Sequence, residues 1–225
     1  MENQNSKKKI ICIMSGGMDS TLCAYMMAQE GYEIVGVHFN YAQRTEVKEL
    51  ACFEAICDDL NISNRYILDI NFLKQLGSAL TDTNVEVRTT GVEKDVPATY
   101  VPFRNGIFLS MAAAIGEKEG AEAIAIGVVQ DDSSGYPDCT EKFIKSIENA
   151  INEGTKESTH LTIKTPLVHL SKAEIVQKSL EYVVPLELTW SCYTNEIMAC
   201  GTCDSCRLRL NGFAQAQAVD PIPYA

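Results

Sequence analysis

The stretch KIICIMSGGMDS, residues 9–20, decides the fold of this 225-residue chain. Its first half is a short apolar run rich in β-branched residues, which is typical of a buried strand. The glycines and polar residues of SGGMDS end that strand, and a helical pattern begins near Asp19. The chain therefore opens as strand, loop and helix, with a glycine-rich loop at the carboxyl end of the first strand.

The same alternation of strand and helix continues along the chain. We predict further strands at residues 33–39, 65–70, 121–128 and 161–167. We predict further helices at 45–60, 103–119, 140–152, from a capping box of Ser171 and Glu174, and at about 206–219, with a loop excursion carrying a short helix at 71–99. This alternation implies a mostly parallel, Rossmann-like α/β sheet with helices on both faces, in one domain of residues 1–225. Such folds bind ligands beyond the carboxyl ends of their strands.

The charge balance disfavours some classes of partner. Lys and Arg number 19 against 30 Asp and Glu, for a net charge of −11, which repels a phosphate backbone and argues against nucleic acid. The sequence has no apolar run of about 18 residues, the length needed to span a bilayer. Its start, MENQNSKKK, lacks the apolar stretch of a signal peptide. We therefore expect a cytoplasmic protein with no membrane partner.

The loop after the first strand has the features of a phosphate cradle. Two consecutive glycines allow positive φ angles and let the backbone amides turn around an anion. The helix start adds its partial positive charge at the same point. Hydroxyl groups can donate to phosphate oxygens, and Asp19 can reach a Mg²⁺ ion that bridges them. The predicted nucleotide site comprises Met14, Ser15, Gly16, Gly17, Met18, Asp19, Ser20 and Thr21.

A lone Gly-Gly pair would fit an ordinary turn equally well, but the whole hexapeptide SGGMDS resembles the S-G-G-x-D-S signature of PP-loop ATP pyrophosphatases. The dinucleotide pattern G-x-G-x-x-G and the Walker lysine are absent. The resemblance implies cleavage of ATP between its α and β phosphates, which adenylylates the substrate. Such a displacement needs positioning and charge neutralisation, which we assign to Ser15 and Asp19. Arg104 and Lys164 are candidates to neutralise the leaving pyrophosphate with Mg²⁺, although either also fits a solvated surface cation.

Four of the nine cysteines crowd into one stretch with the spacing C-x7-C-x2-C-x2-C. Such a set suits a closed, tetrahedral structural zinc site. A 4Fe–4S cluster is the open alternative, because four cysteines also hold that group. The predicted ligands are Cys192, Cys200, Cys203 and Cys206, in a metal-binding loop and terminal helix at residues 189–219. Most of the other five are expected to be buried free thiols, and these five are Cys12, Cys23, Cys52, Cys57 and Cys139.

Seven blocks of sequence in a fixed order carry a more specific resemblance. They are SGGMDS, YAQRTEVKEL, VPFRNGIFLSMAAA, SGYPDC, TPLVHLSKAEIV, LELTWSCY and CGTCDSCRLR. Together they resemble the 7-cyano-7-deazaguanine synthase family, which has the adenine nucleotide alpha-hydrolase-like fold. The resemblance implies an ATP-dependent ligase of queuosine biosynthesis, which converts 7-carboxy-7-deazaguanine and ammonia to the nitrile preQ0 through adenylylated intermediates. It also implies one zinc ion on the four cysteines, and a homodimer.

The family context suggests how the substrate is held. Gln43 and Arg44 are expected to approach its carboxylate. A carboxylate can accept two hydrogen bonds from one edge of a deazaguanine, and Asp131, Asp132 and Asp138 are available for this, while Tyr136 can stack on the ring. The alternative for this stretch is a polar turn in which Asp138 is the N-cap of the next helix.

The chain departs from the family pattern at two positions. Histidine is frequent where Thr45 stands, and a small residue is frequent where Phe103 stands. If that histidine moves protons in other members, Thr45 cannot do so, and the sequence therefore assigns no general base. His38 and His169 are expected to be structural, because each lies in or beside an apolar element.

Two rival functions share the ATP loop. A PP-loop enzyme that modifies tRNA would need a basic surface or an added RNA-binding domain, and the sequence shows neither. The second rival is a zinc-stabilised module that binds a nucleotide without turnover. Release of AMP would exclude it.

Overall fold

The computed structural model describes residues 7–89, 96–130 and 135–225. Its strands are β1 (Lys9–Ile13), β2 (Glu33–Asn40), β3 (Arg65–Asp69), β4 (Ala123–Ile126) and β5 (Thr162–Lys164). Its α-helices are α1 (Met18–Gln29), α2 (Glu46–Asp59), α3 (Arg104–Glu119), α4 (Glu141–Gly154), α5 (Lys172–Glu181) and α6 (Asp204–Gln215). Short 3₁₀ helices follow at η1 (Asn71–Leu76), η2 (Pro137–Cys139) and η3 (Leu186–Leu188). The predicted alternation is confirmed, with β4 and β5 shorter than expected.

The five strands form one parallel sheet in the order β3-β2-β1-β4-β5. In the register of its centre, Ile11 of β1 lies beside Val35 of β2 on one side and Ile124 of β4 on the other. The chain first builds outwards from β1 to β3 and then returns to place β4 on the opposite side of β1. The strand order therefore reverses between β1 and β4, and a crevice opens at the carboxyl ends of such a pair.

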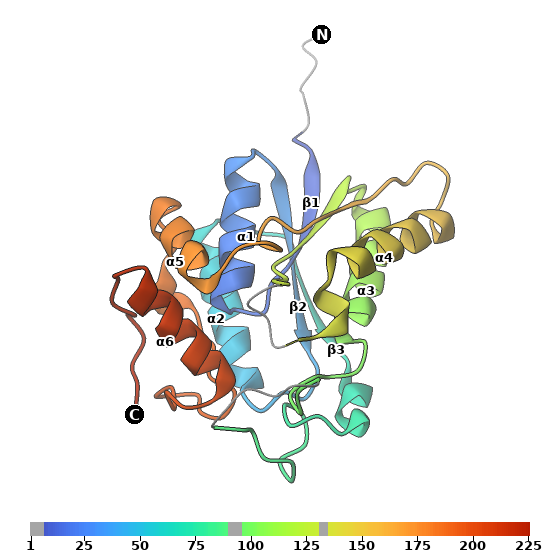
Figure 1. The fold of residues 1–225 in the computed structure, drawn as a ribbon. Coiled ribbons are helices and arrows are strands. Elements are labelled where there is room, and N and C mark those ends of the chain that lie inside the picture. Colours follow the sequence, from blue (N-terminus) through green and yellow to red (C-terminus); the bar gives the residue numbers. More distant parts are fainter. Residues whose placement is uncertain (1–6, 90–95, 131–134) are drawn as a thin grey trace.

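Helices cover both faces of the sheet, as Figure 1 shows. Helices α1, α2, α5 and α6 lie on one face, where Ile10 and Cys12 of β1 enter the core. Helices α3 and α4 lie on the other, where Ile11 and Ile13 point. Because β1, β2 and β4 are buried on both faces, their residues are mostly apolar in sequence rather than alternately polar, whereas the edge strands β3 and β5 are partly exposed and carry polar residues.

Small residues let α3 approach the sheet closely, as the sequence predicted. Ala112 and Ala113 are buried. A Cβ at Gly116 would lie 3.1 Å from a methyl group of Leu161. This close contact positions α3 so that its first residues lie at the carboxyl end of the sheet.

At the start of α5, Ser171 and Glu174 form the predicted capping box.

The excursion after β3 is tied to the start of α2. After η1 the described chain is irregular as far as residue 89. The Arg44 guanidinium donates to the backbone carbonyls of Asp82 and Val85, and the Arg44 amide donates to Leu80 O at 3.0 Å.

Within the described ranges, none of the helices has both the length and the apolar character needed to cross a bilayer.

Candidate active site

A cavity of about 270 Å³ lies at the carboxyl ends of β1 and β4, where the strand order reverses. The loop after β1, the turn at Gly127 after β4, and the starts of α2 and α3 line it. The segment that carries Trp190 and Tyr193 forms another wall. The cavity thus occupies the place where open α/β sheets bind ligands.

The glycine loop folds tightly upon itself at one side of the cavity. Gly16 has a φ angle of +79°, in the left-handed region that favours glycine. The Ser15 amide donates to Ser20 Oγ at 3.2 Å, and the hydroxyl of Thr21 donates to Gly17 O at 2.8 Å. Gly17 is the N-cap of α1 and provides no side-chain hydrogen bond. The first amides of α1 therefore lack a side-chain cap, which makes them donors for an anion.

Neighbouring segments hold the loop so closely that glycine is required. A Cβ at Gly16 would lie 2.6 Å from the backbone oxygen of Glu49 in α2. A Cβ at Gly127 would lie 2.9 Å from the backbone of Asp19. On its other side, the Trp190 amide donates to Gly16 O at 2.9 Å. The loop is therefore wedged between α2, the β4 turn and the cysteine-rich segment.

One carboxylate oxygen of Asp19 is paired with a cation, and the other has no hydrogen-bond partner among the described residues. Its Oδ2 forms an ion pair with Lys172, the first residue of α5. Its Oδ1 is buried and has no hydrogen-bond partner within the part of the chain that the structure describes. An open carboxylate oxygen beside a phosphate cradle fits a divalent cation such as Mg²⁺. We call the loop residues 14–21 with Lys172 the phosphate side of the cavity.

Lys172 lines the cavity beside the glycine loop, whereas the predicted Lys164 does not. The Lys164 ammonium instead pairs with Glu30 at 2.8 Å and lies over the ring of Tyr32. The ion pair of Lys172 joins α5 to α1 across 153 positions of sequence, so a local pattern could not reveal it.

The opposite wall is aromatic and contains one half-buried cation. Arg104, the first residue of α3, donates to the Tyr41 hydroxyl at 3.1 Å. Its guanidinium lies 5.5 Å from the Tyr41 ring centre and 5.9 Å from those of Phe108 and Tyr136. We call Tyr41, Arg104, Phe108 and Tyr136 the aromatic side of the cavity.

Phe103 carries unusual backbone geometry directly before Arg104. As N-cap of α3 it has a φ angle of +55°, a conformation that costs a non-glycine residue about 1–2 kcal/mol. Its ring meets Phe143 edge-on and covers Gly106, where an added Cβ would lie 2.5 Å from the ring. The left-handed backbone gives a physical reason why a smaller residue would suit this position.

The side chains of Gln43 and Arg44 line the cavity but are held by the protein itself. Gln43 accepts from the Tyr41 amide at 2.8 Å and donates to Glu49 Oε2 at 3.1 Å. Arg44 holds the excursion after β3, as described above. Both therefore shape the site whether or not they also touch a ligand.

Glu49 is a cavity residue that the sequence analysis missed. It lies in α2, is partly accessible, and faces the cavity. Burial raises its pKa to about 7, although hydrogen bonds from Thr45 and Gln43 act in the opposite direction. The block YAQRTEVKEL shows a helix but does not show which of its acids points inwards, since that depends on how α2 packs against the loop.

The four residues predicted to contact the deazaguanine differ in their placement. Tyr136 lines the cavity and donates its hydroxyl to Thr99 Oγ1 at 2.9 Å. Asp138 is buried, is not among the lining residues, and accepts from the Asn105 amide at 2.9 Å, so it caps α3. The alternative in which Asp138 caps α4 is wrong, because Thr140 does so. Asp131 and Asp132 lie outside the described residues.

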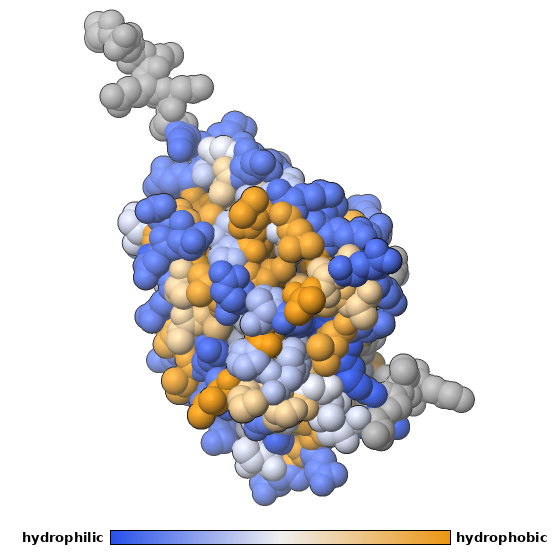
Figure 2. Space-filling view, turned by 90° about the vertical axis from the view of Figure 1, so that its left-hand side faces the viewer, coloured by the Kyte–Doolittle hydropathy of each residue, from blue (hydrophilic) through white to orange (hydrophobic). Residues whose placement is uncertain are grey.

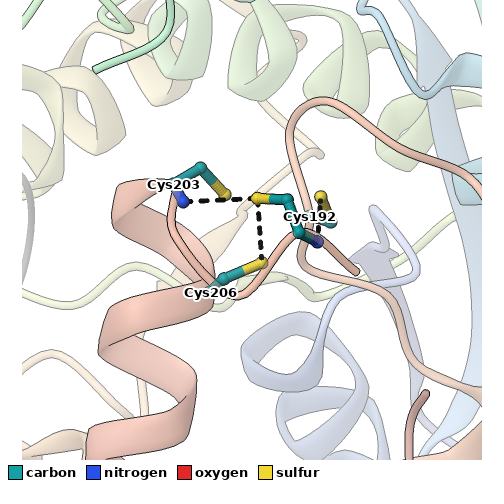
Figure 3. A group of neighbouring side chains, drawn as sticks. Cys192, Cys203 and Cys206 are labelled. Carbon is teal, nitrogen blue, oxygen red and sulfur yellow. Dashed lines mark hydrogen bonds between the residues drawn. The ribbon is translucent and has the colours of Figure 1, made fainter. Parts of the chain in front are cut away.

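The four clustered cysteines converge on one point. Their sulfur atoms all lie within 4.8 Å of one another. Figure 3 shows Cys203 and Cys206 at the start of α6 pointing towards Cys192 on the facing loop. Hydrogen bonds from Cys203 and Cys206 lower the pKa of Cys192, and the amides of Thr194 and Asn195 also donate to its sulfur. This donor set fits a metal ion, because thiolate ligands bind metals and are tuned by such hydrogen bonds.

Arg209 anchors this segment to the rest of the molecule. It is buried, pairs with Asp220 at 2.8 Å, and donates to Thr189 Oγ1 at 2.7 Å. Thr189 immediately precedes Trp190, whose amide supports the glycine loop. The cysteine cluster is thereby linked to the phosphate side. The other five cysteines are buried free thiols, as predicted.

Comparison with known proteins decides the family. Residues 9–217 match the family model described as queuosine biosynthesis protein QueC. The chain belongs to the QueC family. It is 65% identical over 218 residues to the 7-cyano-7-deazaguanine synthase of Sulfurimonas denitrificans, covering 96% of this chain and 97% of that protein. It is 63% identical to the enzyme of the same name from Nautilia profundicola, covering 96% and 98%.

Solved structures show the fold of the QueC-family chain at lower similarity. A 4-thiouridine synthetase in complex with RNA and ATP aligns with a TM-score of 0.51 and 20% identity, over 93% of this chain and 50% of that one. The U34-tRNA thiolase NcsA from Methanococcus maripaludis, solved with its 4Fe-4S cluster, aligns with a TM-score of 0.50 and 14% identity, over 79% and 57%. Family and fold together make this chain an ATP-using enzyme of queuosine biosynthesis.

Proposed function

We propose that this chain is the ligase that converts 7-carboxy-7-deazaguanine and ammonia to 7-cyano-7-deazaguanine at the expense of ATP. One observation carries the proposal. In a chain 65% identical to a 7-cyano-7-deazaguanine synthase, the SGGMDS loop and a half-buried arginine among aromatic rings face one cavity. The phosphate side suits ATP and the aromatic side suits a planar acid.

On the phosphate side, the amides at the start of α1 and the hydroxyls of Ser15 and Ser20 bind the phosphates of ATP. Asp19 offers its open oxygen to Mg²⁺, which neutralises phosphate charge when bound. Lys172 exchanges its pairing with Asp19 for the leaving pyrophosphate, the role first assigned to Lys164. The glycine loop thus presents the α-phosphorus towards the cavity.

On the aromatic side, Arg104 binds the carboxylate of the acid, for which its planar fork of donors is suited. Tyr136 packs against the heterocycle, and Gln43 and Arg44 hold the walls. Asp131 keeps its predicted role of accepting from the edge of the base. Asp138 no longer shares that role, because its carboxylate caps α3.

The chemistry uses one phosphorus reaction twice. A carboxylate oxygen attacks the α-phosphorus, and pyrophosphate leaves with the electron pair of the broken P–O bond. The lone pair of ammonia forms a C–N bond, AMP leaves with the C–O pair, and one proton is lost, which gives the amide. A second ATP activates the amide oxygen in the same way. Departure of AMP with loss of two N–H protons leaves the nitrile.

We propose zinc as the ion of the cysteine cluster. A tetrahedral site with Zn–S bonds of about 2.3 Å places its sulfurs about 3.8 Å apart. The limit of 4.8 Å among these four sulfurs supports a single ion. A 4Fe–4S cluster would interpose iron and sulfide atoms and hold the sulfurs farther apart. Metal analysis of purified protein, with its visible spectrum, distinguishes the two.

We also propose a single-domain homodimer in the cytoplasm. None of the nine cysteines, all of which lie in described residues, forms a disulfide, which is typical of a reducing compartment. The face that carries α5 and α6 exposes Leu180, Val183 and Leu210. Figure 2 shows apolar side chains among polar ones on this side of the molecule. A Val183→Lys variant that becomes monomeric in light scattering would support this face as the dimer contact, and an unchanged mass would reject it.

A turnover assay tests the proposed function. Purified protein is incubated with ATP, ammonium and 7-carboxy-7-deazaguanine, and the products are separated by mass spectrometry. We expect the nitrile, with two AMP formed for each molecule of it. AMP without nitrile would reject the proposal. Tight, salt-resistant binding of tRNA in a gel shift would favour a tRNA-modifying enzyme instead.

A further inference from the structure

The proposed reaction requires a group that removes a proton from nitrogen. When ammonia attacks the adenylylated acid, the new C–N bond leaves a positive charge on nitrogen. The adduct returns to ammonia unless that nitrogen loses a proton before AMP departs. A positioned base typically contributes about 100- to 10,000-fold to such a step.

The cavity offers few groups that could act in this way. Among the described residues that line it, Asp19 and Glu49 are the carboxylates, and no histidine contributes. Asp19 belongs to the phosphate side, where it is paired with Lys172. His38 lies outside the lining, where its Nδ1 meets Met14 O and its ring stacks on Phe53. Glu49 is the remaining acid.

Glu49 lies between the two sides of the cavity. Its own backbone oxygen packs against the glycine loop, because a Cβ at Gly16 would approach it to 2.6 Å. The Arg104 cation of the aromatic side is near enough to interact with its carboxylate. A carbonyl carbon held by Arg104 and joined to the α-phosphate would therefore lie in the space that Glu49 faces.

Two hydrogen bonds fix the direction of the carboxylate. Thr45 Oγ1 donates to Oε1 at 2.8 Å, and Gln43 Nε2 donates to Oε2 at 3.1 Å. Gln43 is itself held by the Tyr41 amide. Each carboxylate oxygen has a second lone pair, so both can still accept a proton.

The surroundings bring the pKa of the Glu49 carboxyl group close to neutral pH, where it can both accept and release a proton. Burial raises the pKa of Glu49 to about 7, and Glu46 of the same helix adds to this effect. The hydrogen bonds from Thr45 and Gln43 and the Arg104 charge oppose it. Tyr41 and Cys52 are the other titratable neighbours, and burial raises the pKa of each, so both are neutral.

We propose that the Glu49 carboxylate accepts the proton that nitrogen loses when ammonia displaces AMP, an inference that rests on the proposed ligase function. An N–H bond breaks and its electron pair stays on nitrogen. The C=O bond re-forms and the C–O pair leaves with AMP. Glu49 becomes a neutral acid and returns the proton to water before the next turnover.

Glu49→Gln tests this role because it keeps shape and hydrogen bonding but removes the base. Two steps are measured separately: exchange of labelled pyrophosphate into ATP, which depends on the acid and reports adenylylation, and formation of amide plus nitrile from ammonium. We expect exchange to stay within about threefold and amide formation to fall about 100-fold or more. Glu46→Gln is the matched control, because Glu46 accepts from the Ala42 amide and is not among the cavity residues. At pH 8, where Glu49 is ionised with or without the Glu46 charge, this variant should leave both steps unchanged.

The pH dependence gives a second readout. At constant free ammonia, amide formation by the wild type should rise with pH through about 7, and this rise should be absent in Glu49→Gln. Thr45→Val removes a hydrogen bond that favours the charged carboxylate, so it should move the rise to higher pH.

Stability gives a third readout that is independent of activity. The folded state holds the Glu49 proton more tightly than the unfolded chain does, so ionisation between pH 4.5 and about 7 destabilises the wild type. Glutamine does not ionise, and the Tm advantage of Glu49→Gln over the wild type should therefore grow from pH 5 to pH 8.

Several results would overturn the inference. These are amide formation by Glu49→Gln within a few fold of the wild type, equal loss of exchange and amide formation, an unchanged pH profile, or a Tm difference that does not depend on pH. Absence of exchange in the wild type would instead reject the proposed function, and this inference with it.

Discussion

The two sides of the cavity are built in different ways. The phosphate side comes mainly from eight consecutive residues, 14–21, whose glycines and hydroxyls define a loop between β1 and α1. The aromatic side gathers Tyr41 from beyond β2, Arg104 and Phe108 from α3, and Tyr136 from the turn before α4. A function shared by many enzymes can be carried by one local motif, whereas substrate choice here depends on how distant elements pack.

The cysteine cluster is tied both to the phosphate side and to Glu49, so disrupting it should have the largest effect. It reaches the phosphate side through the Trp190 amide on Gly16, and Glu49 through Thr45, whose hydroxyl donates to Glu49 and also lies 3.3 Å from Cys192 O. Cys203→Ser should lose the bound metal, lower the free energy of unfolding by about 4 kcal/mol or more, and abolish turnover. Metal content and chemical denaturation measure this.

Cys57→Ser is the control for that variant. Cys57 is a buried free thiol outside the cluster, so this variant should keep its metal. A Cys203→Ser protein with full metal content and wild-type turnover would contradict the link between the cluster and the cavity.

The next largest effect should be confined to the phosphate side. Gly16→Ala forces a left-handed alanine against Glu49 O and Cys52 Cβ, at 2.6 and 2.8 Å. A displacement of the loop of about 1 Å can cost about 100-fold in rate, and we expect at least that loss together with weaker ATP binding. Steady-state kinetics with ATP varied measure both.

Gly31→Ala separates backbone strain from this close contact. Gly31 also has a positive φ angle, +88°, but nothing lies within 4 Å of its added Cβ. It should lose only about 1–2 kcal/mol of stability and keep its KM for ATP. Equal kinetic effects of the two substitutions would mean that the position of the loop is unimportant.

A change on the aromatic side should affect the acid and spare ATP. Arg104→Lys keeps the charge but loses the planar fork that binds a carboxylate. We expect the KM for 7-carboxy-7-deazaguanine to rise about 10- to 100-fold, since hydrogen bonds to charged groups are worth about 1.5–3 kcal/mol. The KM for ATP should change little. A larger rise in the KM for ATP than for the acid would place Arg104 on the phosphate side.

The smallest effect should come from the lysine that the sequence suggested. Lys164→Met breaks a partly exposed pair with Glu30 and a contact with the Tyr32 ring, both outside the cavity, and exposed pairs contribute about 0–1 kcal/mol. Turnover should stay within about twofold of the wild type. Lys172→Met should raise the KM for ATP about tenfold, as loss of one charged contact predicts. If Lys164→Met were the more damaging, the assignment of the two lysines would have to be reversed.

The sequence predicts the parts of this molecule that local signals encode. The apolar run and glycines of residues 9–20, the capping box at Ser171 and the spacing of the four cysteines each define their own geometry, and the structure contains all three. It could not predict that Asp138 caps α3, because the two lie on separate segments joined only by folding. The inward direction of Glu49 likewise depends on the packing of α2 against Gly16.

The most direct test of the account follows an oxygen atom. The central claim is that the carboxylate of the acid attacks the α-phosphorus of an ATP held by residues 14–21. With 7-carboxy-7-deazaguanine labelled with ¹⁸O in its carboxylate, the AMP released should carry ¹⁸O in its phosphate group. Unlabelled AMP, or label in inorganic phosphate with ADP as the nucleotide product, would contradict it.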